Sequence, residues 1–362
     1  MKRIIFFIIV FINIFFISYG QDTSRYSKIL FFDGIEAEGG YGFIMPHHKY
    51  MFYLLGGHIP SFTLQFTKKL NGYKYWHKLY KYPDMGLGLY YADLANPQWL
   101  GRVYAIFGKM KMQVIHFRHF YYDLNAGIAY LTKVFDYQNN YYNTVIGTHI
   151  NFFFKSGFNY YFSLSNNIDM YMNMHLVHYS NGNFREPNAG FNVISIGTGI
   201  RYNYKTPTIQ PSPSLPKLKK NNMEILFAGG VKGIPQDVFN SYSVFTSSVN
   251  YLRKFDYCNS INVGTDLIID NSIKYFYLFK GLSYEVKDKY KAGFHIGYEP
   301  FWGNTSITIQ WGVYIYDPTH LRGIFYHRAG IKYRMNHFIV STSIVSHFFS
   351  AYVLEWKVGY SL

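Results

Sequence analysis

Three side chains within one short stretch have the residue types of a site for nucleophilic catalysis. His178 and Ser180 are separated by one residue. Residues i and i+2 of a β-strand point to the same face, so the imidazole can reach the hydroxyl. If the chain turns back near Arg185–Glu186, Asn192 of the next strand lies beside both. A serine, a histidine that takes its proton and a polar group that orients the histidine together make an activated nucleophile.

The position of these residues along their strands indicates the kind of substrate. His178 and Ser180 continue the more apolar row of the strand Asp169–Asn181, and Asn192 begins the apolar row of the strand that follows. A row that faces lipid favours an acyl chain or a lipid as substrate, whereas a water-soluble substrate would favour a site in the lumen. A His-x-Ser pair alone is a weak motif, and the same residues also fit a strand that simply leaves the bilayer.

Alternating hydrophobicity indicates the elements that must position the three side chains. In Leu354–Leu362 apolar and polar residues alternate, and similar runs recur along the chain. A two-residue period fits strands with lipid on one side and water on the other. After the N-terminal segment no run reaches the ~18 apolar residues of a membrane helix. The sequence therefore predicts an all-β transmembrane antiparallel barrel, a single barrel of roughly 14 to 18 strands.

Two segments depart from this pattern. Residues 206–220 hold four prolines and three lysines near their end, which is typical of an extended loop. A linker between two domains fits the same composition, but we expect a loop within one barrel. Lys274–Glu285 has no clear period. We expect residues 169–204 to form the hairpin that carries the site.

The N-terminus has the pattern of a secretory signal. Lys2 and Arg3 precede the apolar run Ile4–Ile17, and small residues come before Gln21. We expect a signal peptide over residues 1–20, cleaved after Gly20, and a barrel over 21–362. An uncleaved anchor is the alternative, although the apolar run is short for one.

Composition excludes several other classes. One cysteine, Cys258, rules out an intramolecular disulfide and a cysteine-rich metal site. With 14 histidines, chance pairs such as His47–His48 are expected, and we expect no metal and no cofactor. The net charge of +15 suits either binding to lipid phosphates or solvation of loops. An exported chain is not expected to bind nucleic acid.

The motif His178-Tyr179-Ser180-Asn181-Gly182, followed by Pro187-Asn188, Gly190 and Asn192, resembles the lipid A 3-O-deacylase (PagL-type) and acyloxyacyl hydrolase-like family. The C-terminal ~70 residues resemble its longer Bacteroidota form. The resemblance implies an outer-membrane esterase that removes an acyl chain from lipopolysaccharide. It implies Ser180 as the nucleophile, His178 as the base, and Asn181 and Asn188 as contributors to the oxyanion hole.

The chain departs from the family at the third position of the triad. Asn192 stands where the family has Glu. Asn can orient an imidazole but cannot stabilise the imidazolium by charge, and Glu186 is a weaker substitute because it does not match the motif position. Two alternatives therefore stay open: a barrel without activity (a pore or a structural protein) that carries a degenerate motif, and an outer-membrane phospholipase. The expected partners are lipid A and other outer-membrane lipids, and a homodimer is left open.

Overall fold

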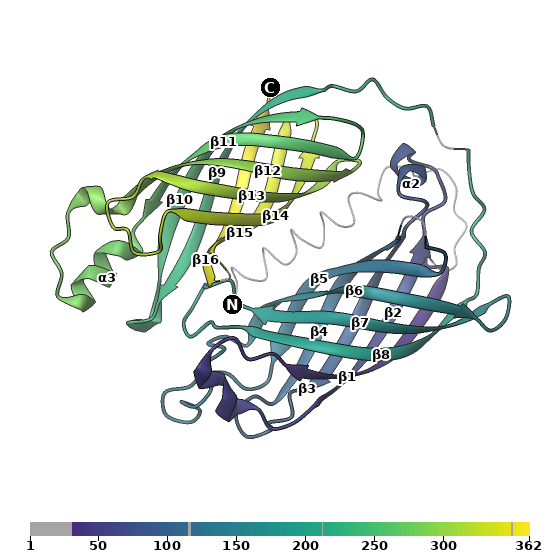
Figure 1. Cartoon of the computed structure of the whole chain (residues 1–362), viewed down its shortest axis with the longest axis horizontal. Helices are drawn as coiled ribbons and strands as arrows, with labels where there is room; N and C mark the ends of the chain where they lie inside the picture. The colour runs from purple at the N-terminus through teal and green to yellow at the C-terminus, as the bar shows by residue number, and fades with distance from the viewer. Residues whose placement is uncertain (1–30, 115–116, 212, 349) are drawn as a thin grey trace.

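The computed structural model describes residues 31–114, 117–211, 213–348 and 350–362, so the expected signal peptide lies outside the described residues. In this part of the chain, sixteen strands form two closed antiparallel barrels of eight strands each. Figure 1 shows the two barrels side by side. The all-β antiparallel barrel class is confirmed, whereas the expectation of one single barrel is wrong.

The first barrel closes through its first and last strands, with Gly34 opposite Asn203 and Ile44 opposite Val193. Its strands follow one another around the barrel in chain order. They are β1 (Gly34–Ile44), β2 (Ile59–Lys69), β3 (Asp84–Asp93), β4 (Arg102–Gln113), β5 (Phe120–Leu131), β6 (Ile150–Ser163), β7 (Ile168–Ser180) and β8 (Phe191–Asn203).

The second barrel closes in the same way, with Glu224 of its first strand opposite Ser361 of its last. It is again an up-and-down arrangement of neighbouring strands. They are β9 (Asn221–Ile234), β10 (Asp237–Lys254), β11 (Asn259–Asp270), β12 (Tyr290–Trp302), β13 (Thr305–Tyr316), β14 (Phe325–Met335), β15 (Phe338–His347) and β16 (Ser350–Ser361).

The proline-rich segment is the reason that there are two barrels. Residues 206–220 contribute no strand in the part of the segment that is described. Proline has no N–H to donate to a sheet ladder, so a run with four prolines interrupts the hairpin series. The segment is a connection between β8 and β9 that runs from one barrel to the other (Figure 1). Hydrophobic alternation specifies strands, but it does not specify which strand closes a barrel.

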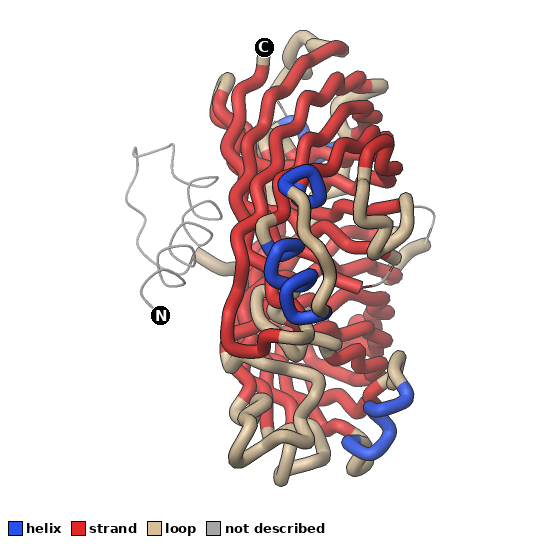
Figure 2. The backbone as a smooth tube through the Cα atoms, turned by 90° about the vertical axis from the view of Figure 1, so that its left-hand side faces the viewer, coloured by secondary structure: helices blue, strands red, loops and turns tan. Residues whose placement is uncertain are grey.

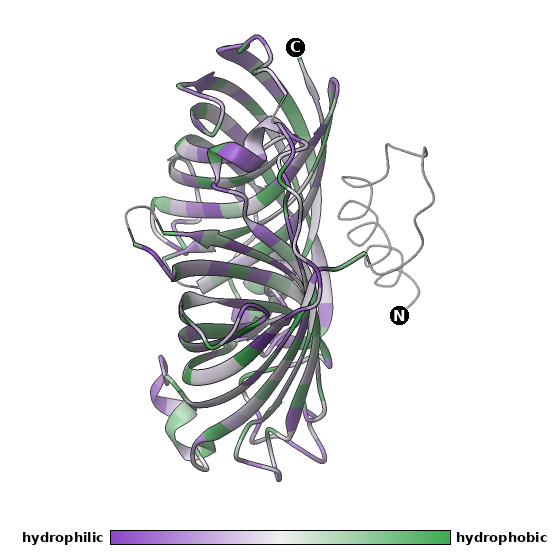
Figure 3. Ribbon diagram, turned by 90° about the vertical axis from the view of Figure 1, so that its right-hand side faces the viewer, coloured by the Kyte–Doolittle hydropathy of each residue, from purple (hydrophilic) through white to green (hydrophobic). Residues whose placement is uncertain are grey.

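Hydrophilic and hydrophobic residues alternate along many of the strands (Figure 3), and this alternation places apolar side chains on the outer face of each barrel. On β7 the outward side chains of Met172, Met174 and Leu176 are exposed, while Asn173 and His175 between them are buried. Eight strands enclose an interior just wide enough for side chains. Each interior is therefore packed with side chains, which include paired charged groups and a cluster of buried apolar residues.

Charged side chains inside both barrels are paired. In the first barrel the Nζ of Lys111 lies 3.1 Å from a carboxylate oxygen of Glu36, and His175 Nε2 lies 2.9 Å from Asp123 Oδ1. In the second barrel Arg328 lies 2.9 Å from an Asp266 oxygen and 3.2 Å from one of Glu355. Buried charges persist because each has a partner.

Helices are short and lie in the connections between strands (Figure 2). The described helices are η1 (Lys49–Leu54), α2 (Tyr75–Leu79), α3 (Ser272–Lys280) and η2 (Val286–Lys289). The segment around Lys274, which had no clear period, thus contains a helix. Within the described residues, no helix combines the length and the hydrophobicity needed to cross a bilayer.

An even number of strands brings the two ends of each barrel to one side. At the opposite side, which we call the site end, lie the connections 45–58, 132–149, 181–190 and 271–289, among others. Most turns on the first side are shorter, such as the two residues between β12 and β13. The loop after Ser180 is therefore one of the longer loops at the site end.

Candidate active site

The pairing of β7 with β8 brings the three sequence-predicted side chains together. His178 lies directly opposite Asn192 in this antiparallel pair. On the other side of β7, Ser180 lies opposite Phe152 of β6. His178 and Ser180 share one face because they are two residues apart on a strand.

The imidazole of His178 lies between the hydroxyl and the amide. Its Nε2 is 3.0 Å from Ser180 Oγ, and its Nδ1 is 2.7 Å from Asn192 Oδ1. A carbonyl oxygen can only accept, so this geometry assigns the proton to Nδ1 and leaves the Nε2 lone pair facing the serine hydroxyl. That is the tautomer a general base needs. Ser180 is 7% exposed, so the hydroxyl is largely shielded from water.

Asn181 and Asn188 lie together beside Ser180, and they are bonded to each other. The main-chain N–H of Asn181 donates to Asn188 Oδ1 over 2.9 Å. The side-chain amide of Asn181 donates to the carbonyl of Arg185 over 2.7 Å. Asn181 therefore holds the loop and orients Asn188, and the Oδ1 of Asn188 is the end of its amide that is turned toward Asn181.

Glu186, the weaker substitute for the triad acid, lies within the loop. Its Oε2 accepts from the main-chain N–H of Asn188 over 3.0 Å. Burial raises the pKa of the Glu186 carboxyl. The contact stabilises the loop backbone beside Asn188, whereas the group that accepts from His178 Nδ1 is Asn192.

The second barrel holds the loop after Ser180, which the sequence did not predict. Asn183 donates from Nδ2 to the carbonyl of Tyr352 over 2.9 Å, and its own carbonyl accepts from Gly233 N over 2.8 Å. Ser241 Oγ donates to the carbonyl of Phe184 over 2.6 Å. These bonds join residues from 50 to 169 positions apart, and no local signal in one sequence reports such contacts.

A second histidine reaches the site from the loop between β1 and β2. His47 Nδ1 lies 3.4 Å from Asn192 Nδ2, and His47 Nε2 lies 3.0 Å from the carbonyl of Ala189. In the sequence His47 is notable only as one of a chance histidine pair, because 145 residues separate it from Asn192.

Apolar side chains border the site on the outer face of the barrel. Phe154 of β6 lies opposite His178, and Leu176 precedes it on the same row of β7. Their side chains are 37% and 40% exposed. The hydroxyl of Ser180 thus lies where an apolar outer surface meets a polar loop.

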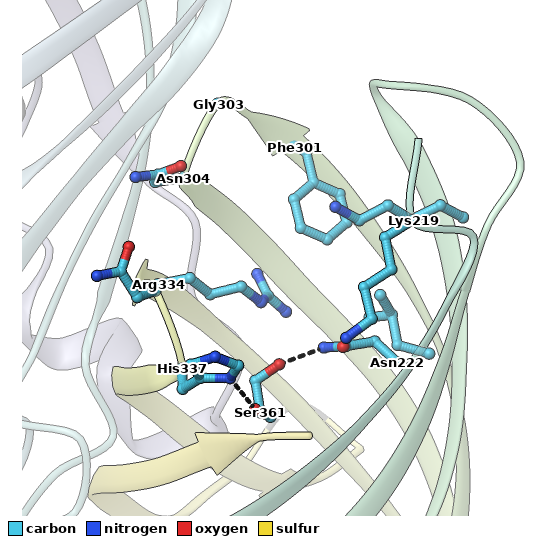
Figure 4. Close-up of a pocket in the computed structure, with 11 residues that line it drawn as sticks. Lys219, Asn222, Phe301, Gly303, Asn304, Arg334, His337 and Ser361 are labelled. Carbon is cyan, nitrogen blue, oxygen red and sulfur yellow. Dashed lines mark hydrogen bonds between the residues drawn. The ribbon is translucent and has the colours of Figure 1, made fainter. Parts of the chain in front are cut away.

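A cavity of about 570 Å³ lies elsewhere, at the far end of the second barrel. Lys219, Arg334 and His337 are among its lining residues, and Figure 4 shows how they surround it. None of the three motif side chains lines it. Among the described residues, no group of three His, Cys, Asp or Glu side chains is arranged to hold a metal ion.

Comparison with solved structures finds large barrels of little similarity. A mutant of the Rh. blastica porin shares 9% identity over 91% of this chain and 99% of its own, with a TM-score of 0.19. CdiB from Escherichia coli shares 8% identity over 92% of this chain and 64% of its own, with a TM-score of 0.23. The siderophore receptor PirA from Acinetobacter baumannii shares 9% identity over 88% of this chain and 43% of its own, with a TM-score of 0.22. A search of curated proteins finds no match.

Two family models match the chain, one on each barrel. The model for lipid A 3-O-deacylase (PagL) matches residues 61–201, which include His178, Ser180 and Asn192. The model for the C-terminal domain of acyloxyacyl hydrolase matches residues 221–362, which hold the whole second barrel. With both barrels matched, the chain belongs to the PagL-type lipid A deacylase family, in a form that carries the acyloxyacyl hydrolase C-terminal domain.

Proposed function

We propose that this chain is a serine esterase of the outer membrane that hydrolyses an acyl ester of lipid A. Its family indicates a hydrolase that acts on lipid A. The observation that carries the serine mechanism is the position of the His178 ring, with Nε2 at 3.0 Å from Ser180 Oγ and Nδ1 at 2.7 Å from Asn192 Oδ1.

The reaction is acyl transfer in two halves. Ser180 Oγ attacks the ester carbonyl while His178 Nε2 takes its proton. Collapse of the tetrahedral intermediate breaks the ester bond, and the imidazolium returns the proton to the leaving sugar hydroxyl. Water, with its proton taken by His178, then attacks the acyl-serine. The imidazolium returns that proton to Ser180 Oγ as the acyl bond breaks, which releases the fatty acid and the free serine. No metal enters either half.

The developing oxyanion needs hydrogen-bond donors. Asn188 supplies one from Nδ2, because its Oδ1 already accepts from the Asn181 main chain. Asn181 then acts mainly by orienting Asn188. Removal of one oxyanion donor costs about 10²–10³ in kcat in well-studied hydrolases.

The substrate class follows from the surroundings of the hydroxyl. The outward apolar residues Phe154 and Leu176 suit an acyl chain, and the polar loop 181–190 suits a sugar headgroup. Outer-membrane barrels have their longer loops on the extracellular side. The site end then faces the outer leaflet, where lipopolysaccharide is found. The charged and apolar side chains that pack both interiors speak against a pore.

The test is deacylation by the mature chain, residues 21–362, refolded in detergent micelles. Purified lipid A is incubated with the wild type, with Ser180→Ala and with Ser346→Ala, a control serine that also neighbours a histidine. Mass spectrometry follows the loss of one acyl chain. We expect loss with the wild type and Ser346→Ala, and at least about 10³-fold less with Ser180→Ala.

Other results would redirect the proposal. Equal deacylation by Ser180→Ala would contradict the serine mechanism. Loss of acyl chains from glycerophospholipids but not from lipid A would identify a phospholipase. No loss from either lipid, with a folded wild type, would favour the non-catalytic barrel.

A further inference from the structure

A continuous chain of polar contacts runs from Ser180 to the loop between β1 and β2. Ser180 Oγ contacts His178 Nε2, and His178 Nδ1 contacts Asn192 Oδ1. The other end of the Asn192 amide, Nδ2, lies 3.4 Å from His47 Nδ1. His47 Nε2 lies 3.0 Å from the carbonyl of Ala189, which is the last group in this series of contacts.

The carbonyl of Ala189, the last group in the series, determines which atom donates in each of the other hydrogen bonds. The carbonyl of Ala189 can only accept, so His47 Nε2 carries a proton. In a neutral imidazole the other nitrogen is then an acceptor, and His47 Nδ1 accepts from Asn192 Nδ2. The amide of Asn192 thereby turns its oxygen toward His178.

This direction matters because an amide has two different ends. A carboxylate presents an acceptor to the imidazole in either orientation, whereas a reversed Asn presents a donor. A reversed Asn192 would place the His178 proton on Nε2, and that nitrogen could no longer take the proton of Ser180. In serine proteases, Asp→Asn at the equivalent triad position lowers kcat about 10⁴-fold through the wrong tautomer.

We propose that His47 is a positioning residue of this site, which fixes the orientation of the Asn192 amide and thereby the tautomer of His178. The inference rests on the proposed serine mechanism. It gives a physical reason why an Asn can stand where the family has Glu: an acceptor supplied from the first hairpin removes the ambiguity of the amide.

The first experiment changes the hydrogen-bonding character at position 47. Gln retains an acceptor, Ala removes it, and Lys offers only donors. We expect kcat near wild type for His47→Gln and about fivefold lower for His47→Ala, which is the worth of one hydrogen bond. His47→Lys turns the Asn192 oxygen toward itself, so we expect a loss between about tenfold and 10⁴-fold. KM stays unchanged in all three variants.

The second experiment repeats the series with Asn192→Glu. A carboxylate presents an acceptor in either orientation, so the differences in kcat among the variants at position 47 should disappear. With Ala or Lys at position 47, kcat should then differ from that with His by less than about twofold, since no amide remains to orient. His58→Ala is the matched control, because His58 is an exposed histidine at the other end of the same loop, with its ring tilted against that of Tyr41. It should match the wild type in both backgrounds.

The outcomes separate this inference from the proposed function. If Ser180→Ala abolishes deacylation but Ala, Gln and Lys at position 47 give equal kcat, the role of His47 is overturned and the serine mechanism stands. The same losses with Asn192 and with Glu at position 192 would also overturn it, because they would indicate a structural effect. If Ser180→Ala retains activity, the serine mechanism itself fails.

Discussion

At the residue scale, the unusual feature of the site is a neutral third member. Asn192 Oδ1 accepts from His178 Nδ1 over 2.7 Å, so the imidazole is oriented. When the imidazole takes the serine proton it becomes a cation, and an amide offers it no opposite charge. The chain therefore has the geometry of a triad without its full electrostatic stabilisation.

Asn192→Glu should raise kcat. A carboxylate beside His178 stabilises the imidazolium, and we expect a gain of at least about tenfold, with about 10⁴-fold as the upper bound. The measurement is the initial rate of lipid A deacylation. Asn167→Glu adds the same charge at the other end of the same hairpin and should leave the rate unchanged. A lower or equal rate for Asn192→Glu, with the barrel folded, would contradict this account.

Residues close in sequence were predictable, and distant ones were not. The shared face of His178 and Ser180 follows from strand periodicity, and the position of Asn192 follows from one turn. His47 comes from another hairpin, 145 residues away from Asn192. Its approach depends on the closure of β1 against β8, which hydrophobic alternation does not encode.

At the element scale, the loop after Ser180 belongs to the first barrel but is held by hydrogen bonds to the second barrel. Asn183 is 3% exposed and bonds to both Tyr352 and Gly233 of the second barrel. It also has a φ of +66°, a left-handed conformation that Asn tolerates better than most residues. The loop carries Asn188, the proposed oxyanion donor, so its fixation should influence the rate.

Asn183→Gly should loosen this loop and slow the reaction. Glycine retains the left-handed backbone, so the change isolates the lost bond to the Tyr352 carbonyl, worth about 1–3 kcal/mol when a buried partner is left unpaired. We expect several-fold lower kcat and faster chymotryptic cleavage after Phe184. Asn336→Gly, at another left-handed Asn far from the site, is the control. Wild-type values for both readouts would show that the second barrel does not hold the loop.

The number of barrels was the main error at this scale. Alternation and turns indicated 14 to 18 strands, and the described residues contain sixteen. The composition of the proline-rich segment 206–220 fitted both a loop and a linker, and we expected the loop. Only the register of β1 with β8 decides between them, since it shows that the first eight strands close by themselves.

At the scale of the whole molecule, each barrel has an apolar outer surface and an interior packed with paired charges and buried apolar side chains. Arg328 is 2% exposed and contacts both Asp266 and Glu355. A buried charge that loses its partner is costly. The interior pairs thus stabilise the second barrel, and through it the loop 181–190.

Arg328→Met should destabilise the second barrel by about 3–5 kcal/mol, because it removes the cation between two buried carboxylates. Arg102→Met breaks a pair whose side chains are 58% and 30% exposed, so it should shift the unfolding midpoint far less than Arg328→Met. Reversible urea unfolding in lipid vesicles measures both. Equal shifts of the two midpoints would contradict the role assigned to the interior pairs.

The central claim is that Ser180 is the nucleophile and that His178 activates it. The most direct measurement is covalent labelling of the folded, full chain with a fluorophosphonate, which reacts with activated serines, followed by peptide mass spectrometry. We predict one labelled site, Ser180, and at least about 10³-fold slower labelling in His178→Ala. Labelling of another residue, or none in a preparation that deacylates lipid A, would contradict the account.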